Sequence, residues 1–201
     1  MSHISGMIRA MSAVPRVHLA DPQANVREIV ELLRQADAQN VRLCVFPELC
    51  LCGYTCADLL IHPPLLSGCL QALDTLLQAP VRAAFVVGLP LEIGGRLYNC
   101  AVAVCGGRIL GVVPKTHLPG SCEFYEKRWF EPGHSAPESM TLCGQTVPVG
   151  GDLVFDCGLF SFGVELCEDL WVPAPPSASL CMGGALLIAN PSASNELVTK
   201  H

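Results

Sequence analysis

The chain has 201 residues, of which 51% are hydrophobic and 15% charged, and its formal net charge is -6. This length and apolar content suit one folded domain with its own core and exclude a disordered segment. The negative charge argues against nucleic acid or an anionic membrane as a partner. No apolar run reaches the roughly eighteen residues that span a bilayer, and the first residues do not resemble a signal peptide, so we expect a cytoplasmic protein.

Short apolar runs alternate with helical patterns, which predicts an α/β fold. The helical patterns place apolar residues on one face, and Asp21-Pro22 opens the first of them with a cap and a first-turn proline. A Cys-Gly-Gly turn joins the last two strands of this part as a tight hairpin. The predicted elements are strands over 8–14, 41–46, 83–87, 97–104 and 108–113, and helices over 21–39 and 65–77.

The second half of the chain is less regular. Residues 114–148 are rich in glycine, proline and aromatic residues and predict a long functional loop. Beyond it we expect a strand pair at 153–156 and 159–166 and a last buried strand at 185–189. The chain then stops without a closing helix or strand, so we expect one domain over 1–201 that is incomplete at its C-terminus.

The twelve cysteines do not predict a disulfide framework, because most lie singly in apolar segments as small hydrophobic residues. The one dense run is Cys50, Cys52 and Cys56. A zinc site normally needs a second Cys/His pair at short spacing, and none follows, so we expect no metal.

Three polar residues each follow an apolar run that is typical of a strand: Glu48, Lys115 and Cys167. Reactive groups gather at the carboxyl ends of strands in α/β sheets. Together they form a coherent set, in which the carboxylate accepts the thiol proton, the thiolate attacks a carbonyl and the ammonium stabilises the oxyanion. Taken singly, the Glu and the Lys are more simply solvated residues and the Cys a core residue, and spacing alone does not bring them together.

The segments around these residues resemble a known family. FPELCLCGYTCADLL at 46–60, VVPKTHLP at 112–119 and FGVELCEDLWVPAPPS at 162–177 are similar to the catalytic segments of the nitrilase, or carbon-nitrogen hydrolase, superfamily. CEDLW and its proline-rich tail resemble the branch that forms the glutaminase domain of glutamine-dependent NAD synthetases. The resemblance implies an α-β-β-α sandwich with Glu48 as general base, Lys115 as catalytic lysine and Cys167 as nucleophile.

The resemblance also nominates residues around this triad. EFYEKRWFEPG at 123–133 resembles the family's loop with an auxiliary glutamate, here Glu126, although a loop carboxylate paired with a neighbouring Lys or Arg is the alternative. The family often has a tyrosine after the Leu-Pro that follows the lysine, whereas this chain has Gly120-Ser121-Cys122 there. Tyr125, or Phe124 beside it, is therefore expected to line the substrate pocket instead.

Substrate binding is implied for three further residues. ANPSASN at 189–195 resembles the segment that binds the amino-acid head group, which nominates Ser194, and Lys200 follows it. Glu168 would contact the amino group of glutamine, or would serve as an acidic residue that opens a helix.

By this resemblance the chain would hydrolyse glutamine through a thioester and would need no cofactor in this domain. Ammonia would pass to a synthetase domain, absent from this chain, that uses ATP and deamido-NAD, and the family commonly forms homo-oligomers. The alternatives are a stand-alone amidase acting on another carboxamide or carbamoyl compound, and an inactive fragment that serves in assembly. A Cys/His enzyme using His62, His117 or His134 is less favoured, because no orienting partner is evident for these histidines.

Overall fold

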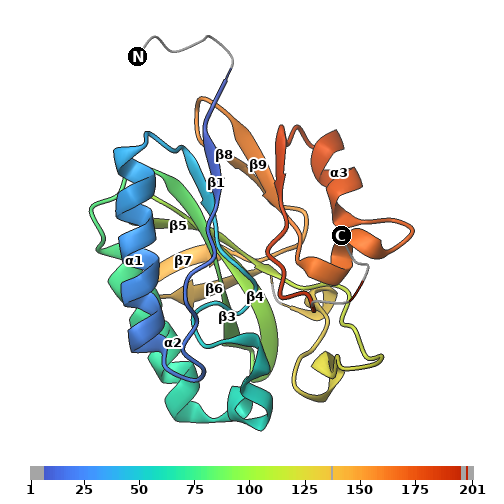
Figure 1. The fold of residues 1–201 in the computed structure, drawn as a ribbon. Helices are drawn as coiled ribbons and strands as arrows, with labels where there is room; N and C mark the ends of the chain where they lie inside the picture. The colour runs from blue at the N-terminus through green and yellow to red at the C-terminus, as the bar shows by residue number, and fades with distance from the viewer. Residues whose placement is uncertain (1–6, 137, 196–197, 199–201) are drawn as a thin grey trace.

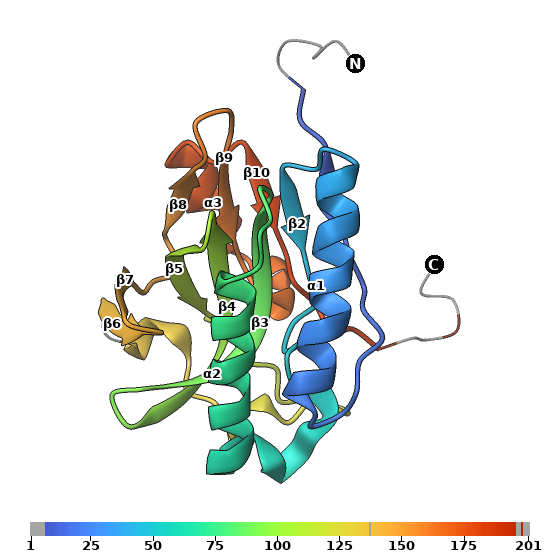
Figure 2. The same cartoon turned by 90° about the vertical axis from the view of Figure 1, so that its left-hand side faces the viewer.

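The computed structural model describes residues 7–136, 138–195 and 198. Two helices, α1 (Pro22–Ala38) and α2 (Pro63–Leu77), lie side by side over one face of a five-stranded sheet (Figures 1 and 2). The other face of that sheet packs on a three-stranded sheet, whose outer face is covered by α3 (Pro176–Met182) (Figure 1). The α/β class that the sequence pattern predicts and the α-β-β-α sandwich that the resemblance implies are therefore both confirmed.

The five-stranded sheet follows chain order. Its first three strands are parallel and its last three antiparallel, so the middle strand belongs to both patterns. The strands are β1 (Ala10–Ser12), β2 (Leu43–Val45), β3 (Ala84–Ile93), β4 (Arg96–Cys105) and β5 (Arg108–Pro114). Since parallel strands are covered on both faces, β2 and β3 are apolar throughout most of their length.

The smaller sheet and the connecting segments complete the second half. The sheet has the order β10 (Leu187–Ala189), β9 (Ser161–Val164) and β8 (Val154–Asp156), and a separate hairpin joins β6 (Ser139–Leu142) to β7 (Gln145–Pro148). Four short 3-10 segments are η1 (Tyr54–Ile61), η2 (Glu126–Arg128), η3 (Gly133–Ser135) and η4 (Cys167–Trp171).

Two apolar clusters hold these layers together. Helix α1 buries Ile29 and Leu33 against residues such as Phe85 of β3, and a fully buried aliphatic side chain contributes roughly 1.5–3 kcal/mol. On the opposite face of the sheet, Val86 packs in a second cluster with Phe162 of β9. Successive side chains of β3 therefore point alternately into the two clusters, and this alternation fixes which face of the strand meets each layer.

Strands β1, β9 and β10 are shorter than predicted, and three larger differences follow. Strand β3 continues to Ile93, beyond the predicted end at residue 87, and pairs with β4 across a Gly94-Gly95 turn. The segment 114–148 contains the β6–β7 hairpin and is not wholly irregular. Helix α3 was not predicted, and its Cys181 is exposed and not part of the core.

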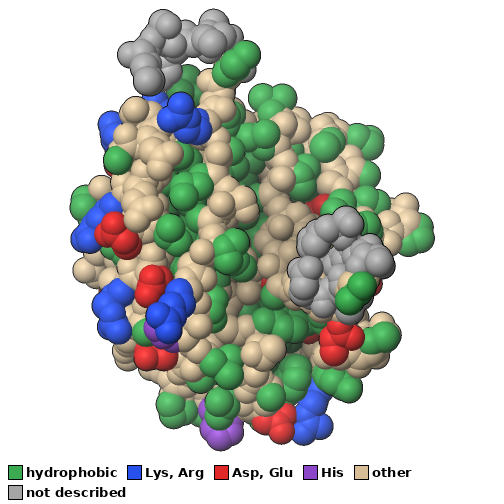
Figure 3. Space-filling model, in the orientation of Figure 1, with side chains coloured by type: hydrophobic (Ala, Val, Ile, Leu, Met, Phe, Trp, Pro, Cys, Tyr) green, Lys and Arg blue, Asp and Glu red, His purple; other side chains and the backbone are tan. Residues whose placement is uncertain are grey.

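The described residues contain free cysteines, no membrane-spanning helix and no metal-binding group. All twelve cysteines lie in the described ranges and are free thiols. Within those ranges no helix is long and apolar enough to cross a bilayer, and no group of three His, Cys, Asp or Glu is placed to hold a metal ion. On the face in Figure 3, the charged side chains gather mainly over α1 and along the lower edge, with both signs present.

One glycine fixes the loop that carries Glu48. A side chain at Gly88 in β3 would place its Cβ 2.3 Å from the backbone nitrogen of Leu49 and 2.9 Å from the carbonyl carbon of Glu48. The Gly88 carbonyl in turn accepts a hydrogen bond of 3.1 Å from Leu51 N. The glycine therefore lets the loop after β2 lie directly on β3.

We predict that Gly88→Ala lowers the free energy of unfolding by about 1–3 kcal/mol, because a backbone cannot move aside as a side chain can. Chemical denaturation of the variant measures this. Gly120→Ala is the matched control, since its Cβ would meet only the flexible Lys127 side chain at 3.3 Å, and a change within about 0.5 kcal/mol is expected. A Gly88→Ala protein as stable as the native one would show that the loop is not held by this contact.

Candidate active site

The ends of strands from both sheets meet at one place. Glu48 lies three residues beyond the end of β2, Lys115 directly follows β5, and Cys167 lies three residues beyond the end of β9. The structure brings Glu48 and Lys115 into direct contact and places Cys167 close enough for both charges to act on its thiol. These three residues are the ones that the sequence nominated as catalytic.

Lys115 is held by two carboxylates in the interior. Its Nζ donates to Glu48 Oε1 at 2.6 Å and to Glu126 Oε1 at 2.5 Å. All three residues are at most 2% exposed, so water cannot replace either bond. The alternative for Glu126, a loop carboxylate paired with a neighbouring Lys or Arg, does not match its contacts, because Glu126 pairs with Lys115 and Arg128 pairs with Asp58 at 2.8 Å.

Two residues that the sequence analysis did not nominate complete this cluster. Asn99, within β4, donates from Nδ2 to Glu48 Oε1 at 2.8 Å and to Glu126 Oε2 at 3.2 Å. The hydroxyl of Tyr54 donates to Glu126 Oε1 at 2.7 Å. Tyr54 belongs to the GYT stretch that carried the family resemblance, whereas Asn99 is a polar residue in an otherwise apolar strand, which was the one available signal.

Cys167 is the first residue of η4, at the turn that follows β9. Its φ of +44° lies in the left-handed region, which is costly for a residue with a side chain and is typical of functional positions. Its backbone N–H donates to the Pro191 carbonyl at 3.1 Å. The Ala193 N–H contacts the thiol and also donates to Glu48 Oε2 at 3.1 Å, so the carboxylate and the sulfur lie beside the same amide.

Burial and charge set the protonation of these groups. Burial raises the pKa of Glu48 and the charge of Glu126 adds to this, against the lowering effect of Lys115 and Asn99. Burial disfavours the charged form of Lys115, but the two carboxylates outweigh it and raise its pKa above 10.5. Lys115 is therefore an ammonium at neutral pH, and Glu48 is a stronger base than an ordinary glutamate.

Burial, together with the charge of Glu48, raises the pKa of the Cys167 thiol above 9.0. Lys115, Ser192 and Ala193 act in the opposite direction by stabilising the thiolate. The resting group is a protonated thiol, so its use as a nucleophile requires a base within reach. None of the groups that act most on this thiol is a histidine, which argues against a Cys/His pair.

The residues nominated for substrate binding differ in their burial. Glu168 is half-buried and lines a pocket of about 440 Å³ together with His117, Lys127 and Glu131. Ser194 is exposed and lies next to Ala193. Their roles stay predictions.

The nominated Tyr125 lies at the margin of the site. Tyr125 is 62% exposed, while Phe124 beside it makes an edge contact with the Tyr54 ring at 6.2 Å between centroids. Phe124 is therefore the nearer of the two to the buried cluster. Lys200 lies outside the described residues.

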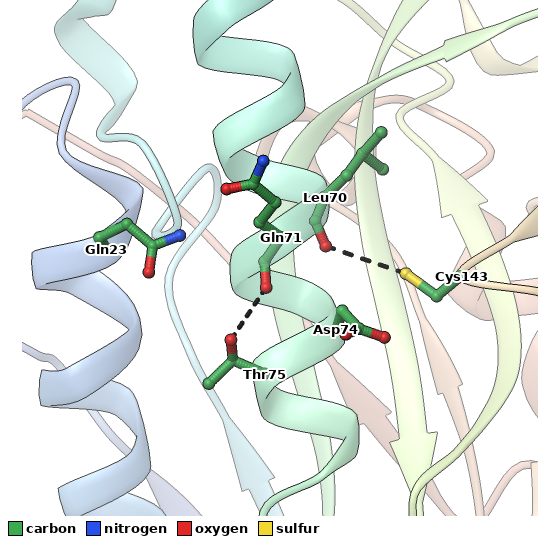
Figure 4. A pocket seen from close by; sticks show the side chains of 6 residues that line it. All are labelled: Gln23, Leu70, Gln71, Asp74, Thr75 and Cys143. Atoms are coloured by element: carbon green, nitrogen blue, oxygen red, sulfur yellow. Dashed lines mark hydrogen bonds between the residues drawn. The ribbon is translucent and has the colours of Figure 1, made fainter.

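A larger pocket of about 550 Å³ lies away from this cluster, on the exposed face of α2 (Figure 4). Its polar groups bond locally: Thr75 donates to the Gln71 carbonyl at 2.9 Å, and Cys143 approaches the Leu70 carbonyl at 3.9 Å. Burial and the charge of Asp74 raise the pKa of the Cys143 thiol, and none of the described residues that line this pocket is a cation that could stabilise a thiolate, whereas Lys115 does so for Cys167. The chemistry is therefore better placed at Cys167.

The arrangement around Cys167 can carry out acyl transfer. A thiol, a carboxylate base and a permanent cation share one cluster that is closed to water on the lysine side. These are the groups needed to form and hydrolyse a thioester from an amide.

Known proteins are similar to this chain in sequence and in fold. The chain is 39% identical over 194 residues to a glutamine-dependent NAD(+) synthetase of Mycobacterium bovis, a match that covers 94% of this chain and 29% of that protein. A crystal structure of a glutamine-dependent NAD(+) synthetase from Cytophaga hutchinsonii superposes with a TM-score of 0.85 at 28% identity, over 96% of this chain and 32% of that one. The chain thus spans about a third of the length of these relatives.

A smaller enzyme has the same fold. An amidase from Nesterenkonia superposes with a TM-score of 0.76 over 96% of this chain and 67% of that chain, and at 21% identity this likeness shows the fold alone. The model of the carbon-nitrogen hydrolase family matches residues 9–200, which is nearly the whole chain. The chain therefore belongs to the carbon-nitrogen hydrolase family.

Proposed function

We propose that this chain hydrolyses the side-chain amide of glutamine through a thioester on Cys167, as the glutaminase part of a glutamine-dependent NAD synthetase. The observation that carries the proposal is the buried Lys115, held between Glu48 and Glu126 and adjacent to the Cys167 thiol. The identity to the mycobacterial synthetase over 94% of this chain supports glutamine as the amide.

Thiol activation begins at Glu48. Its carboxylate takes the thiol proton, the sulfur attacks the amide carbon, and the amide oxygen becomes an oxyanion. Lys115 supplies one stabilising charge, and loss of one such donor costs about 3 kcal/mol in transition-state stabilisation. A backbone N–H beside the sulfur would supply a second donor, and since the Cys167 N–H already bonds the Pro191 carbonyl, that of Glu168 is the candidate.

Breakdown of this intermediate releases ammonia. The leaving nitrogen receives the proton held by Glu48, and a γ-glutamyl thioester remains on Cys167. Glu48 then removes a proton from a water molecule, which attacks the thioester carbon and frees glutamate and the thiol. Glu126, Asn99 and Tyr54 orient Lys115 and Glu48 throughout these steps by their hydrogen bonds.

Glutamine recognition completes the proposal. Glu168 offers a carboxylate to the substrate's amino group, and Ser194, with Lys200, offers donors to its carboxylate. Phe124 or Tyr125 would line the pocket entrance. The half-buried position of Glu168, next to the nucleophile and on a pocket that also contains Lys127, supports this assignment.

The proposal extends to the protein that contains this chain. Ammonia would serve a synthetase domain that amidates deamido-NAD with ATP, and neither molecule would bind this domain. Twelve free thiols support a reducing compartment such as the cytoplasm. Large apolar side chains left exposed near α3, including Trp171, Met182 and Leu186, support assembly into a homo-oligomer.

We predict that Cys167→Ala abolishes glutaminase activity in the intact protein, because Cys167 supplies the thiol on which the charges of Glu48 and Lys115 act. An electrophilic glutamine analogue should label Cys167, as mass spectrometry of the peptides would show. Cys181→Ala, which alters an exposed thiol on α3, is the matched control and should keep native activity.

Two outcomes would contradict the assignment. Label on Cys50, Cys52 or Cys56 would move the nucleophile to thiols that are at most 3% exposed. A native protein that hydrolyses short aliphatic amides faster than glutamine would favour the stand-alone amidase.

We also predict the direction of the pH dependence of kcat/KM. Glu48 must be ionised to act as base, so kcat/KM falls as pH drops through the Glu48 pKa, which lies above 4.5. Glu126→Gln removes a charge that raises this pKa, so the acidic limb of the profile should move to lower pH.

Glu92→Gln, a change at an exposed glutamate of β3, is the control and should leave the limb in place. Initial rates across the acidic range provide the profile. An acidic limb that moves to higher pH in Glu126→Gln would mean that Glu126 does not act on the base in this way.

A further inference from the structure

A buried carboxylate outside the Glu48–Lys115–Glu126 cluster binds the segment that follows the lysine. Asp169 is 1% exposed. Its Oδ1 accepts hydrogen bonds from His117 N at 2.7 Å and from Thr116 N at 3.2 Å, and Oδ2 lies 3.3 Å from Thr116 N. Thr116 and His117 are the two residues directly after Lys115, so this contact fixes the backbone from which the lysine side chain departs.

The same carboxylate closes the turn that carries the nucleophile. Leu166 N donates to Asp169 Oδ2 at 3.1 Å, and Asp169 N donates back to the Leu166 carbonyl at 2.9 Å. Cys167 lies inside this reciprocal pair and has the left-handed φ of +44°. A backbone held in that region needs surrounding contacts to keep it there.

We propose that Asp169 is a positioning residue, whose carboxylate ties the backbone after Lys115 to the turn of Cys167 and so sets the ammonium against the sulfur. The carboxylate of Asp169 accepts these hydrogen bonds from backbone N–H groups and not from Lys115 Nζ or the thiol. It therefore acts on both catalytic residues through the backbone. The inference rests on the proposed function, because it concerns how that site is held.

A carboxylate suits this position because it only accepts. The three N–H groups of Thr116, His117 and Leu166 all point at it, and hydrogen bonds from N–H to an ionised oxygen are stronger than those to a neutral one. An asparagine of the same size would keep one acceptor oxygen and turn an amide NH₂ toward an N–H donor. The replacement therefore removes the hydrogen bonds to one carboxylate oxygen while it leaves the side-chain volume nearly unchanged.

The test compares Asp169→Asn with Asp37→Asn in the intact protein. Asp37 makes a similar tie far from the site, accepting from Arg82 N at 2.9 Å and Ala83 N at 3.3 Å. We expect Asp169→Asn to lower kcat at least about tenfold, because small misplacements of catalytic groups are costly, with KM little changed. Asp37→Asn should lower thermal stability and leave kcat unchanged.

A second readout needs no substrate. Lys115 lowers the pKa of the Cys167 thiol, so its displacement should move the pH profile of iodoacetamide alkylation at Cys167 to higher pH in Asp169→Asn and not in Asp37→Asn. If the native protein has no glutaminase activity, the proposed function fails, and the alkylation profile still tests the positioning role. An unchanged profile and unchanged kcat in a folded Asp169→Asn protein would overturn the inference.

Hydrogen exchange in the native protein covers the case in which Asp169→Asn does not fold. The adjacent amides of Thr116 and His117 lie far in sequence from that of Leu166, yet all three share one acceptor residue. We expect all three to be protected and to exchange together. Rapid exchange at Thr116 and His117 beside a protected Leu166 would show that Asp169 does not join the two segments.

Discussion

The site depends on an ammonium group buried between two carboxylates. Lys115 could not remain charged in the interior without partners, and Glu48 and Glu126 supply them at 2.6 and 2.5 Å. Buried ion pairs seldom add stability over an apolar replacement, so their retention here points to chemistry. Two negative charges against one positive charge keep Glu48 basic while Lys115 stays protonated, which suits one base and one fixed cation.

The rest of the fold delivers and holds these groups. Strand ends from two sheets converge, so each reactive side chain departs from a rigid element. The backbone is left-handed at Leu49, directly after the base, and at Cys167, the nucleophile. This conformation costs energy that the surrounding packing must offset. Gly88 packs against the first of these strained loops, and Asp169 bonds the second.

Sequence reasoning reached the layers of the fold and the polar residues at strand ends, because these follow from local periodicity and from the family resemblance. It missed Asn99 because a single polar residue in an apolar strand does not reveal which side chains it faces. It missed Asp169 because an acidic residue early in a helix is usually a solvated cap. Such roles depend on pairing between distant segments, for example residues 115–117 with 166–169, which no local pattern encodes.

The central claim is that the Lys115 ammonium faces the oxygen of an acyl group on Cys167. A crystal structure of the intact protein after reaction with an electrophilic glutamine analogue tests it most directly. The account predicts an adduct on the Cys167 sulfur whose former carbonyl oxygen lies about 3 Å from Lys115 Nζ, with the lysine still bonded to Glu48 and Glu126. An adduct oxygen directed away from Lys115, with the ammonium unchanged in its carboxylate pair, would contradict the account.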